Sequence, residues 1–243
     1  MARSLESRPS RKRFRDRSMT QTRLASFLLT GLLAATTQAG AADVKFTGFA
    51  HGSETVQYTL GGTNSPHSGS ASAGGFSTVL NGGPTFVSYC VDLYQTISFG
   101  TLYTDYTGPG TTHAFNNANA FADLSRLYAR AGVVANSVAE AAFQIAVWEI
   151  AYETASNGYD LASGDAVFSG GTAASSALGL ASTWLTSLGG AGPDVQVLES
   201  GRQQDVIFAP VPEPETYAML VAGLAAVGFM SRRQARAARS VSA

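Results

Sequence analysis

The sequence has little cysteine, little histidine and few charged residues. A single cysteine, Cys90, among 243 residues excludes an internal disulfide. The three histidines, His51, His67 and His113, show no metal-ligand spacing, so we expect no metal site. A G-x-S-x-G turn, a phosphate-binding glycine loop and a calcium loop are also missing. We therefore expect a protein that is not an enzyme and that uses no cofactor.

Basic residues are nearly absent from the central body of the chain. Twelve of the 16 Lys and Arg lie in residues 3–23 and 232–239, and only four lie between those segments. Thirteen Asp and Glu fall within residues 43–205, which gives this body a net charge of −9. Nucleic-acid binding needs clustered basic residues, so we exclude a nucleic acid partner. The low charged fraction, 14% of all residues, favours an exported surface protein.

Residues 1–41 predict a signal peptide for export. Basic residues precede an apolar run at residues 24–35, and small-x-small cleavage sites end at Ala39 and Ala41. Both Met1 and Met19 remain open as the start, since residues 19–41 alone make a normal signal. A membrane anchor is the alternative, but the apolar run is short for a span of about 20 residues. We therefore expect a cleaved signal.

Alternating apolar and polar residues predict strands near both ends of the body. This pattern covers residues 44–60, 76–80, 85–93 and 102–106. Residues 195–198 and 205–208 indicate a further hairpin. Residues 61–75 are rich in Gly and Ser, and we expect a loop there.

Helical spacing dominates the middle of the chain. Apolar residues recur at helical intervals over residues 121–131, and Gly132 ends that predicted helix. A second helix is predicted at residues 137–154, where Ser137 and Glu140 fit the S-x-x-E capping box. A third covers residues 178–188. Strands at both ends with helices between them predict an α+β fold, an antiparallel β-sheet or sandwich with an inserted helical hairpin.

The second predicted helix carries polar residues in two different settings. Glu149 and Glu153 are spaced i,i+4 and are either a reactive carboxylate pair or, as we expect, a solvated face. Gln144 is flanked by the large apolar residues Phe143 and Ile145. On a buried face its amide must find partners or lose about 1–3 kcal/mol.

The C-terminal segment combines three elements in order. Pro212-Glu213-Pro214 precedes an apolar stretch at residues 216–230, which precedes Arg232 and Arg233. This arrangement closely resembles the PEP-CTERM sorting signal of Gram-negative bacteria. Physically, the apolar stretch would form a C-terminal transmembrane helix whose basic end stays on the cytoplasmic side. Because it is short for a stable span, we expect a transient one rather than a plain C-terminal anchor.

The PEP-CTERM resemblance implies a processing route. An exosortase-type enzyme would cleave near the Pro-Glu-Pro motif after export through the inner membrane. The protein would then reach the cell surface or the extracellular polysaccharide matrix. We accordingly predict a signal peptide at 1–41, an extracellular domain at 42–209, a sorting signal at 210–235 and a tail at 236–243.

A second resemblance rests on two short motifs. Tyr89-Cys90-Val91-Asp92, followed by Gln144-Ile145-Ala146-Val147-Trp148, is similar to the thioester domains of bacterial surface adhesins. In that family a Cys near the end of a strand joins the side chain of a helical Gln, and ammonia leaves. The resemblance implies a thioester between Cys90 and Gln144 that an amine or hydroxyl on a target surface attacks. Phe143 departs from the family pattern, which has Thr before the Gln.

Thioester chemistry makes demands on the surrounding residues. The Cys90 thiol must ionise, at least transiently, because the thiolate is the nucleophile. Donors must stabilise the developing oxyanion, and the sequence does not identify them. Tyr89, Phe143 and Trp148 are candidates for excluding water. Asp92 and His113 are candidate proton carriers, although we expect surface polar roles for both.

The sequence therefore supports two functions. The first is an exported surface protein that attaches covalently, through the thioester, to an amine- or hydroxyl-bearing target or an exopolysaccharide. The second is a non-catalytic structural or binding component of the exopolysaccharide matrix. In the second function Cys90 is a small buried hydrophobic residue and Gln144 a core amide bonded to nearby backbone. Loss of ammonia between the two residues distinguishes these functions.

Overall fold

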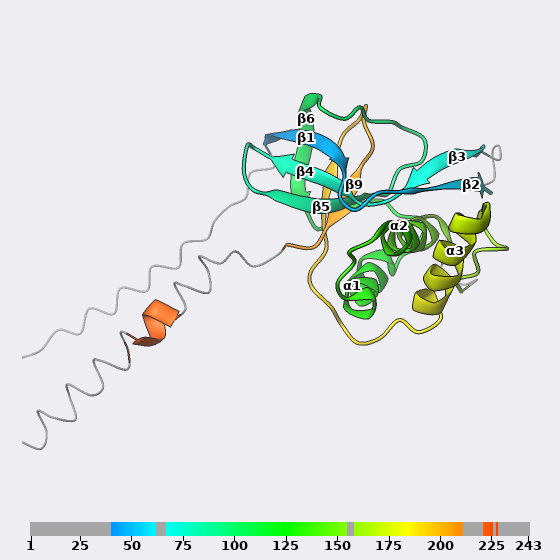
Figure 1. The fold of residues 1–243 in the computed structure, drawn as a ribbon. Helices are drawn as coiled ribbons and strands as arrows, with labels where there is room; N and C mark the ends of the chain where they lie inside the picture. The colour runs from blue at the N-terminus through cyan, green and yellow to red at the C-terminus, as the bar shows by residue number, and fades with distance from the viewer. Residues whose placement is uncertain (1–39, 62–66, 155–157, 211–220, 226, 228–243) are drawn as a thin grey trace, which may run out of the picture. The chain divides into compact units, whose positions relative to one another are not determined.

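The computed structural model describes residues 40–61, 67–154, 158–210, 221–225 and 227 (Figure 1). The predicted signal peptide thus lies outside the described residues except at its last two positions. The predicted sorting signal lies mostly outside them, although residues 221–225 and 227 are helical. Within the described part of the chain, no helix has the length and apolar character needed to cross a membrane.

Six antiparallel strands close into a barrel in the order β1-β4-β5-β9-β8-β6. Closure pairs every strand on both sides, which leaves these six without an open edge. The predicted antiparallel pairing of strands is confirmed, but these six strands form a closed barrel rather than an open sheet or a sandwich. The predicted C-terminal hairpin is confirmed, because β8 and β9 pair and complete the barrel. The bounds are β1 Ala41–Phe49, β4 Phe76–Leu80, β5 Thr85–Cys90, β6 Leu102–Gly110, β8 Gln196–Glu199 and β9 Val206–Phe208.

A second antiparallel sheet has the order β3-β2-β7, with β2 at Glu54–Leu60, β3 at His67–Ala73 and β7 at Ala166–Ser169. The prediction of a loop over residues 61–75 is wrong for β3. Every residue of β3 pairs with one of β2, from Glu54–Ala73 to Leu60–His67. This pairing overrides the low strand propensity of the Ser- and Gly-rich sequence.

The predicted helical hairpin is confirmed by α1 at Ala120–Ala131 and α2 at Ser137–Tyr152. Gly132 ends α1 with a positive φ of 63°, a conformation that suits glycine. The capping box is wrong, because Asn136 is the N-cap and accepts a hydrogen bond from the Ala139 N–H. Ser137 Oγ instead donates to Glu54, and Glu140 points into the interior. A third helix, α3, spans Thr172–Leu185.

Helix α2 is buried on all sides. It packs against α1, α3, β5 and the three strands of the second sheet. All twelve residues from Glu140 to Ala151 are buried, which is the pattern of a core helix rather than a surface helix. The expectation that Glu149 and Glu153 form a solvated face is wrong, since their exposed fractions are 0% and 1%. Glu149 Oε1 accepts from the Asp160 N–H at 2.8 Å, and Glu153 Oε2 accepts from the Asp165 N–H at 2.8 Å.

Two glycine-to-alanine substitutions should change stability in opposite directions. A Cβ at Gly75 would meet Glu140 Oε2 and lie 2.6 Å from Val87 Cγ1, so Gly75→Ala should destabilise the fold by about 1–3 kcal/mol. Gly179 is exposed within α3, with open space around it, so Gly179→Ala should stabilise by about 0.5–1 kcal/mol. Urea unfolding measures both changes. If both substitutions changed the free energy of unfolding by the same amount, the close packing around Gly75 would be contradicted.

The buried Glu149 carboxyl should give stability a specific pH dependence. Burial raises its pKa to about 8, and the nearby Glu153 adds to the rise. The folded chain therefore holds this proton more tightly than the unfolded chain, and the unfolding free energy falls as pH rises from about 4.5 to about 8. Glu149→Gln removes the titration and should flatten that fall.

The measurement is urea unfolding of wild type and Glu149→Gln at several pH values between about 5 and about 8. Asp43→Asn, which removes an exposed carboxylate, serves as the charge-matched control and should keep the wild-type slope. If Glu149→Gln has the same slope as wild type, the buried carboxyl does not titrate in this range.

Candidate functional site

Cys90 and Gln144 lie directly against each other in the core. Cys90 is the last residue of β5, and Gln144 lies on the face of α2 that packs against this strand. The Cys90 N–H donates to Gln144 Oε1 at 2.9 Å, and Gln144 Nε2 donates to the Cys90 carbonyl at 2.7 Å. Each residue is 1% exposed. The two hydrogen bonds fix the amide plane beside the cysteine and satisfy both ends of a buried polar group.

The Cys90 thiol is held by the turn that follows β5. Sγ donates to the Asp92 carbonyl at 2.9 Å, and the Asp92 N–H lies 3.3 Å from Sγ. Burial raises the pKa of the Cys90 thiol to about 12, against smaller lowering effects of the Trp148 indole and the Asp92 backbone. The resting thiol is therefore neutral near pH 7, and it must lose its proton to react.

The residues predicted to surround the site are mostly buried around it. Phe143, Ala146 and Trp148 are at most 2% exposed, and the Tyr89 ring lies 4.4 Å from that of Phe143. Trp148 Nε1 is buried without a hydrogen-bond partner in the described part of the chain. The indole lowers the pKa of the Cys90 thiol, although its N–H makes no hydrogen bond of ordinary geometry with the sulfur.

Glu140, on the first turn of α2, is a site residue whose role the sequence did not reveal. Its carboxylate accepts from Tyr89 Oη at 2.8 Å and from the Gly75 N–H at 3.2 Å, and it lies 2.6 Å from His51 Nδ1. Burial and the Glu140 charge raise the pKa of Tyr89 well above its usual range. Because Tyr89 precedes Cys90, this cluster fixes the strand that carries the thiol.

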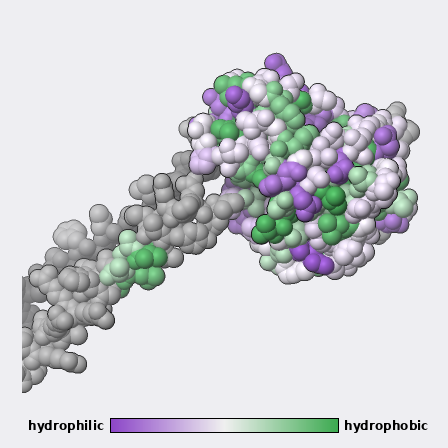
Figure 2. Space-filling view, in the orientation of Figure 1, coloured by the Kyte–Doolittle hydropathy of each residue, from purple (hydrophilic) through white to green (hydrophobic). Residues whose placement is uncertain are grey.

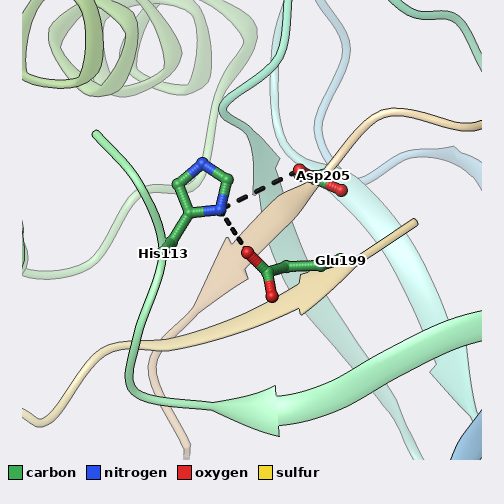
Figure 3. A group of neighbouring side chains, drawn as sticks. All are labelled: His113, Glu199 and Asp205. Atoms are coloured by element: carbon green, nitrogen blue, oxygen red, sulfur yellow. Dashed lines mark hydrogen bonds and ion pairs between the residues drawn. The ribbon is translucent and has the colours of Figure 1, made fainter. Parts of the chain in front are cut away.

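The two candidate proton carriers do not hydrogen-bond the sulfur through their side chains. The Asp92 carboxylate accepts from the Tyr94 N–H at 2.7 Å, so only the backbone of Asp92 contacts Sγ. His113 Nδ1 lies 2.6 Å from Glu199 Oε1 and 3.9 Å from Asp205 Oδ2 (Figure 3). This second cluster was not predicted, because His113 is distant in sequence from Glu199 and Asp205 and the pairing of β6 with β8 brings it to their hairpin.

A pocket of about 170 Å³ lies between the turn after Cys90, which contributes Asp92, and the second cluster, which contributes His113 and Asp205. Asp92 lies on its wall beside the Cys90 turn, and His113 and Asp205 lie on the wall contributed by the barrel. Burial raises the pKa of Asp205 to about 6. The remaining lining residues are Val91, Ala114, Phe115, Asn116, Ala151 and Tyr152.

The surface gives no sign of a large apolar binding area on the face in view. Figure 2 shows hydrophobic areas that are small and separated by hydrophilic ones. Large exposed apolar side chains in the folded body are Tyr94, Phe99, Leu102 and Val133. Isolated exposed apolar residues are ordinary on soluble surfaces.

Comparison with known proteins identifies the C-terminal segment. The family model of the PEP-CTERM protein-sorting motif matches residues 210–234. No curated protein matches the chain, and no solved structure matches it. The motif marks an exported protein that an exosortase-type enzyme processes, with a cell-surface or extracellular location.

Proposed function

We propose that this chain is an exported surface protein in which Cys90 and Gln144 form an internal thioester for covalent attachment to a target. The observation that carries the proposal is the paired hydrogen bonding of the Gln144 amide to the Cys90 backbone, with both residues 1% exposed. This arrangement holds the acyl donor beside the only cysteine of the chain. Such positioning is the main requirement for a reaction between two groups of one molecule.

Thioester formation needs no added reactant, because the two side chains supply every atom of the thioester and of the ammonia that leaves. The Cys90 sulfur attacks Cδ of Gln144, and a tetrahedral intermediate forms with its negative charge on Oε1. The C–Nε2 bond then breaks, and the nitrogen leaves as ammonia with the proton that came from the thiol. The product has one new S–C bond and has lost one ammonia.

The contacts around the amide suit each step of that reaction. The Cys90 N–H already donates to Oε1 at 2.9 Å, the atom on which the negative charge develops. Trp148 Nε1 is a buried donor near the sulfur with no competing partner among the described residues. The Cys90 carbonyl holds Nε2 at 2.7 Å and so orients the leaving group. The high pKa of the thiol makes the reaction slow. A slow reaction is sufficient, because each molecule forms its thioester only once.

The thioester, once formed, must be shielded from water and must still be accessible to the target. Phe143 and Trp148 are buried and exclude water from the acyl carbon. The pocket beside Asp92 offers an approach to the Cys90 turn. An amine or hydroxyl that attacks the acyl carbon releases the Cys90 thiol and leaves the target joined to the Gln144 side chain by an amide or ester bond.

The second candidate function is a non-covalent component of the extracellular matrix. The same two hydrogen bonds favour it, because they give the oxygen and the nitrogen of a buried amide one partner each without any reaction. In that case the role of Gln144 is to hold α2 against β5 through these two hydrogen bonds. Covalent chemistry is the only difference between the two functions, and mass spectrometry measures it directly.

For the thioester, we expect the wild-type chain to lack one ammonia and to lose its free thiol. The full chain is purified, denatured in guanidinium and treated with iodoacetamide, because native burial alone blocks alkylation of Cys90. Peptide mass spectrometry should find the peptides of Cys90 and Gln144 joined. Treatment with methylamine before digestion should separate them and add methylamine to Gln144.

Cys90→Ala and Gln144→Ala serve as the two controls, and both should give unmodified peptides at the remaining residue. A matched Gln95→Ala variant should retain the cross-link. Complete alkylation of wild-type Cys90 after denaturation, with Gln144 unmodified, would disprove the thioester and leave the matrix component as the function.

Processing at the sorting motif is tested separately. Replacing Pro212, Glu213 and Pro214 with Ala should leave an uncleaved precursor in the membrane fraction of the native host. Replacement of residues 236–238, beyond the matched motif, is the control and should preserve release. Immunoblotting of membrane and extracellular fractions gives the distribution. Equal release of both variants would contradict recognition of the Pro-Glu-Pro motif.

A further inference from the structure

Three side chains of metal-ligating type meet at the end of the β8–β9 hairpin (Figure 3). His113 follows β6, Glu199 is the last residue of β8, and Asp205 directly precedes β9. One ligand atom from each lies within 4.8 Å of the other two. We propose that His113, Glu199 and Asp205 bind one divalent transition-metal ion, with Zn²⁺ as the best fit.

The donor set points to this class of ion. One imidazole nitrogen and two carboxylate oxygens are ordinary ligands of Zn²⁺. Ca²⁺ and Mg²⁺ favour oxygen-only coordination, so the imidazole argues against them. The buried Cys90 thiol is turned toward the Asp92 carbonyl and is not part of the set.

The distances fit coordination after a small adjustment. Ligands about 2.1 Å from a tetrahedral Zn²⁺ lie roughly 3.4 Å from one another. His113 Nδ1 is 3.9 Å from Asp205 Oδ2, which is too long for a hydrogen bond, and 2.6 Å from Glu199 Oε1. Coordination would require the His113–Glu199 pair to open by less than about 1 Å and the His113–Asp205 pair to close by about 0.5 Å. The Glu199 side chain is 41% exposed and able to move.

Neighbouring groups hold two of the ligands in position. Asp205 Oδ1 accepts from the Ser200 N–H at 2.6 Å, which directs Oδ2 toward His113. The His113 ring packs edge-on against Phe115, with 4.4 Å between ring centroids. Contacts of this kind fix the orientation of metal ligands and raise affinity.

The charge of the cluster favours a bound cation. Glu199 and Asp205 face a single histidine, and the negative charge of Asp92 also acts on Asp205. No Lys or Arg forms an ion pair with these carboxylates within the described ranges. A divalent ion would offset this excess of negative charge.

The pocket leaves space for the rest of the coordination sphere. His113 and Asp205 line its wall, and its volume of about 170 Å³ accommodates water or a small ligand on the ion. Three protein ligands leave the fourth position of a tetrahedral zinc ion open to water or a small ligand. The ion would also join the segment after β6 to the β8–β9 hairpin.

The test is isothermal titration calorimetry of the full chain with ZnCl₂, after chelator treatment and without a polyhistidine tag. We expect one saturable site per chain that persists in excess Ca²⁺. His113→Ala, Glu199→Gln and Asp205→Asn should each weaken binding by about tenfold or more. Glu199→Gln keeps the side-chain size and an acceptor for His113, so it tests the site even if another variant misfolds.

His51→Ala is the matched control, because His51 also lies 2.6 Å from a carboxylate, that of Glu140, but has no third ligand. It should leave Zn²⁺ affinity unchanged, and so should Cys90→Ala, which separates this site from the thioester. Several weak sites in place of one, or equal loss in His51→Ala and His113→Ala, would overturn the proposal.

Discussion

The burial of α2 on every side is the constraint on which the rest of the fold depends. A helix in this position carries polar side chains at low cost only where the surrounding protein supplies hydrogen-bond partners, and among the described residues Trp148 Nε1 and Glu149 Oε2 are the atoms of α2 that lack one. Glu140 therefore binds the Tyr89 hydroxyl, and Gln144 binds the backbone of Cys90. Farther along, Glu149 and Glu153 accept from the chain that precedes β7. These polar contacts fix the register of α2 against both sheets.

The burial of α2 also determines why Gln144 lies against Cys90. An amide buried beside β5 has to use the groups at the end of that strand, which are the N–H and C=O of Cys90. The helix thus delivers a carboxamide to a cysteine whether or not the two react. What would make the site reactive is the direction of the Cys90 N–H, which points at the oxygen where charge would accumulate.

Sequence patterns predicted the helical hairpin and most barrel strands, because each of these depends on local periodicity. Cys90 and Gln144 are in contact, while the thioester between them stays a prediction. The patterns failed where tertiary structure decides. β3 is Ser- and Gly-rich and forms a strand only because β2 pairs with it along its length. Ser137 and Glu140 resembled a capping box, but Asn136 is the N-cap and Glu140 is buried. His113, Glu199 and Asp205 carry no common motif, since the β8–β9 hairpin joins the two carboxylates and the pairing of β6 with β8 adds the histidine.

Barrel closure also determines how the molecule would carry mechanical load. β9 is the last strand before the matched motif at residue 210, and it pairs antiparallel with β5, Cys90 opposite Val206. Tension between the C-terminal end of β9 and Cys90 pulls the two strands past each other along their length. Their hydrogen bonds, which lie across the strands, then bear the force together rather than one after another. The pairing of β9 with β5, the strand whose last residue binds the Gln144 amide, is thus a shear contact, the geometry in which paired strands resist separation best.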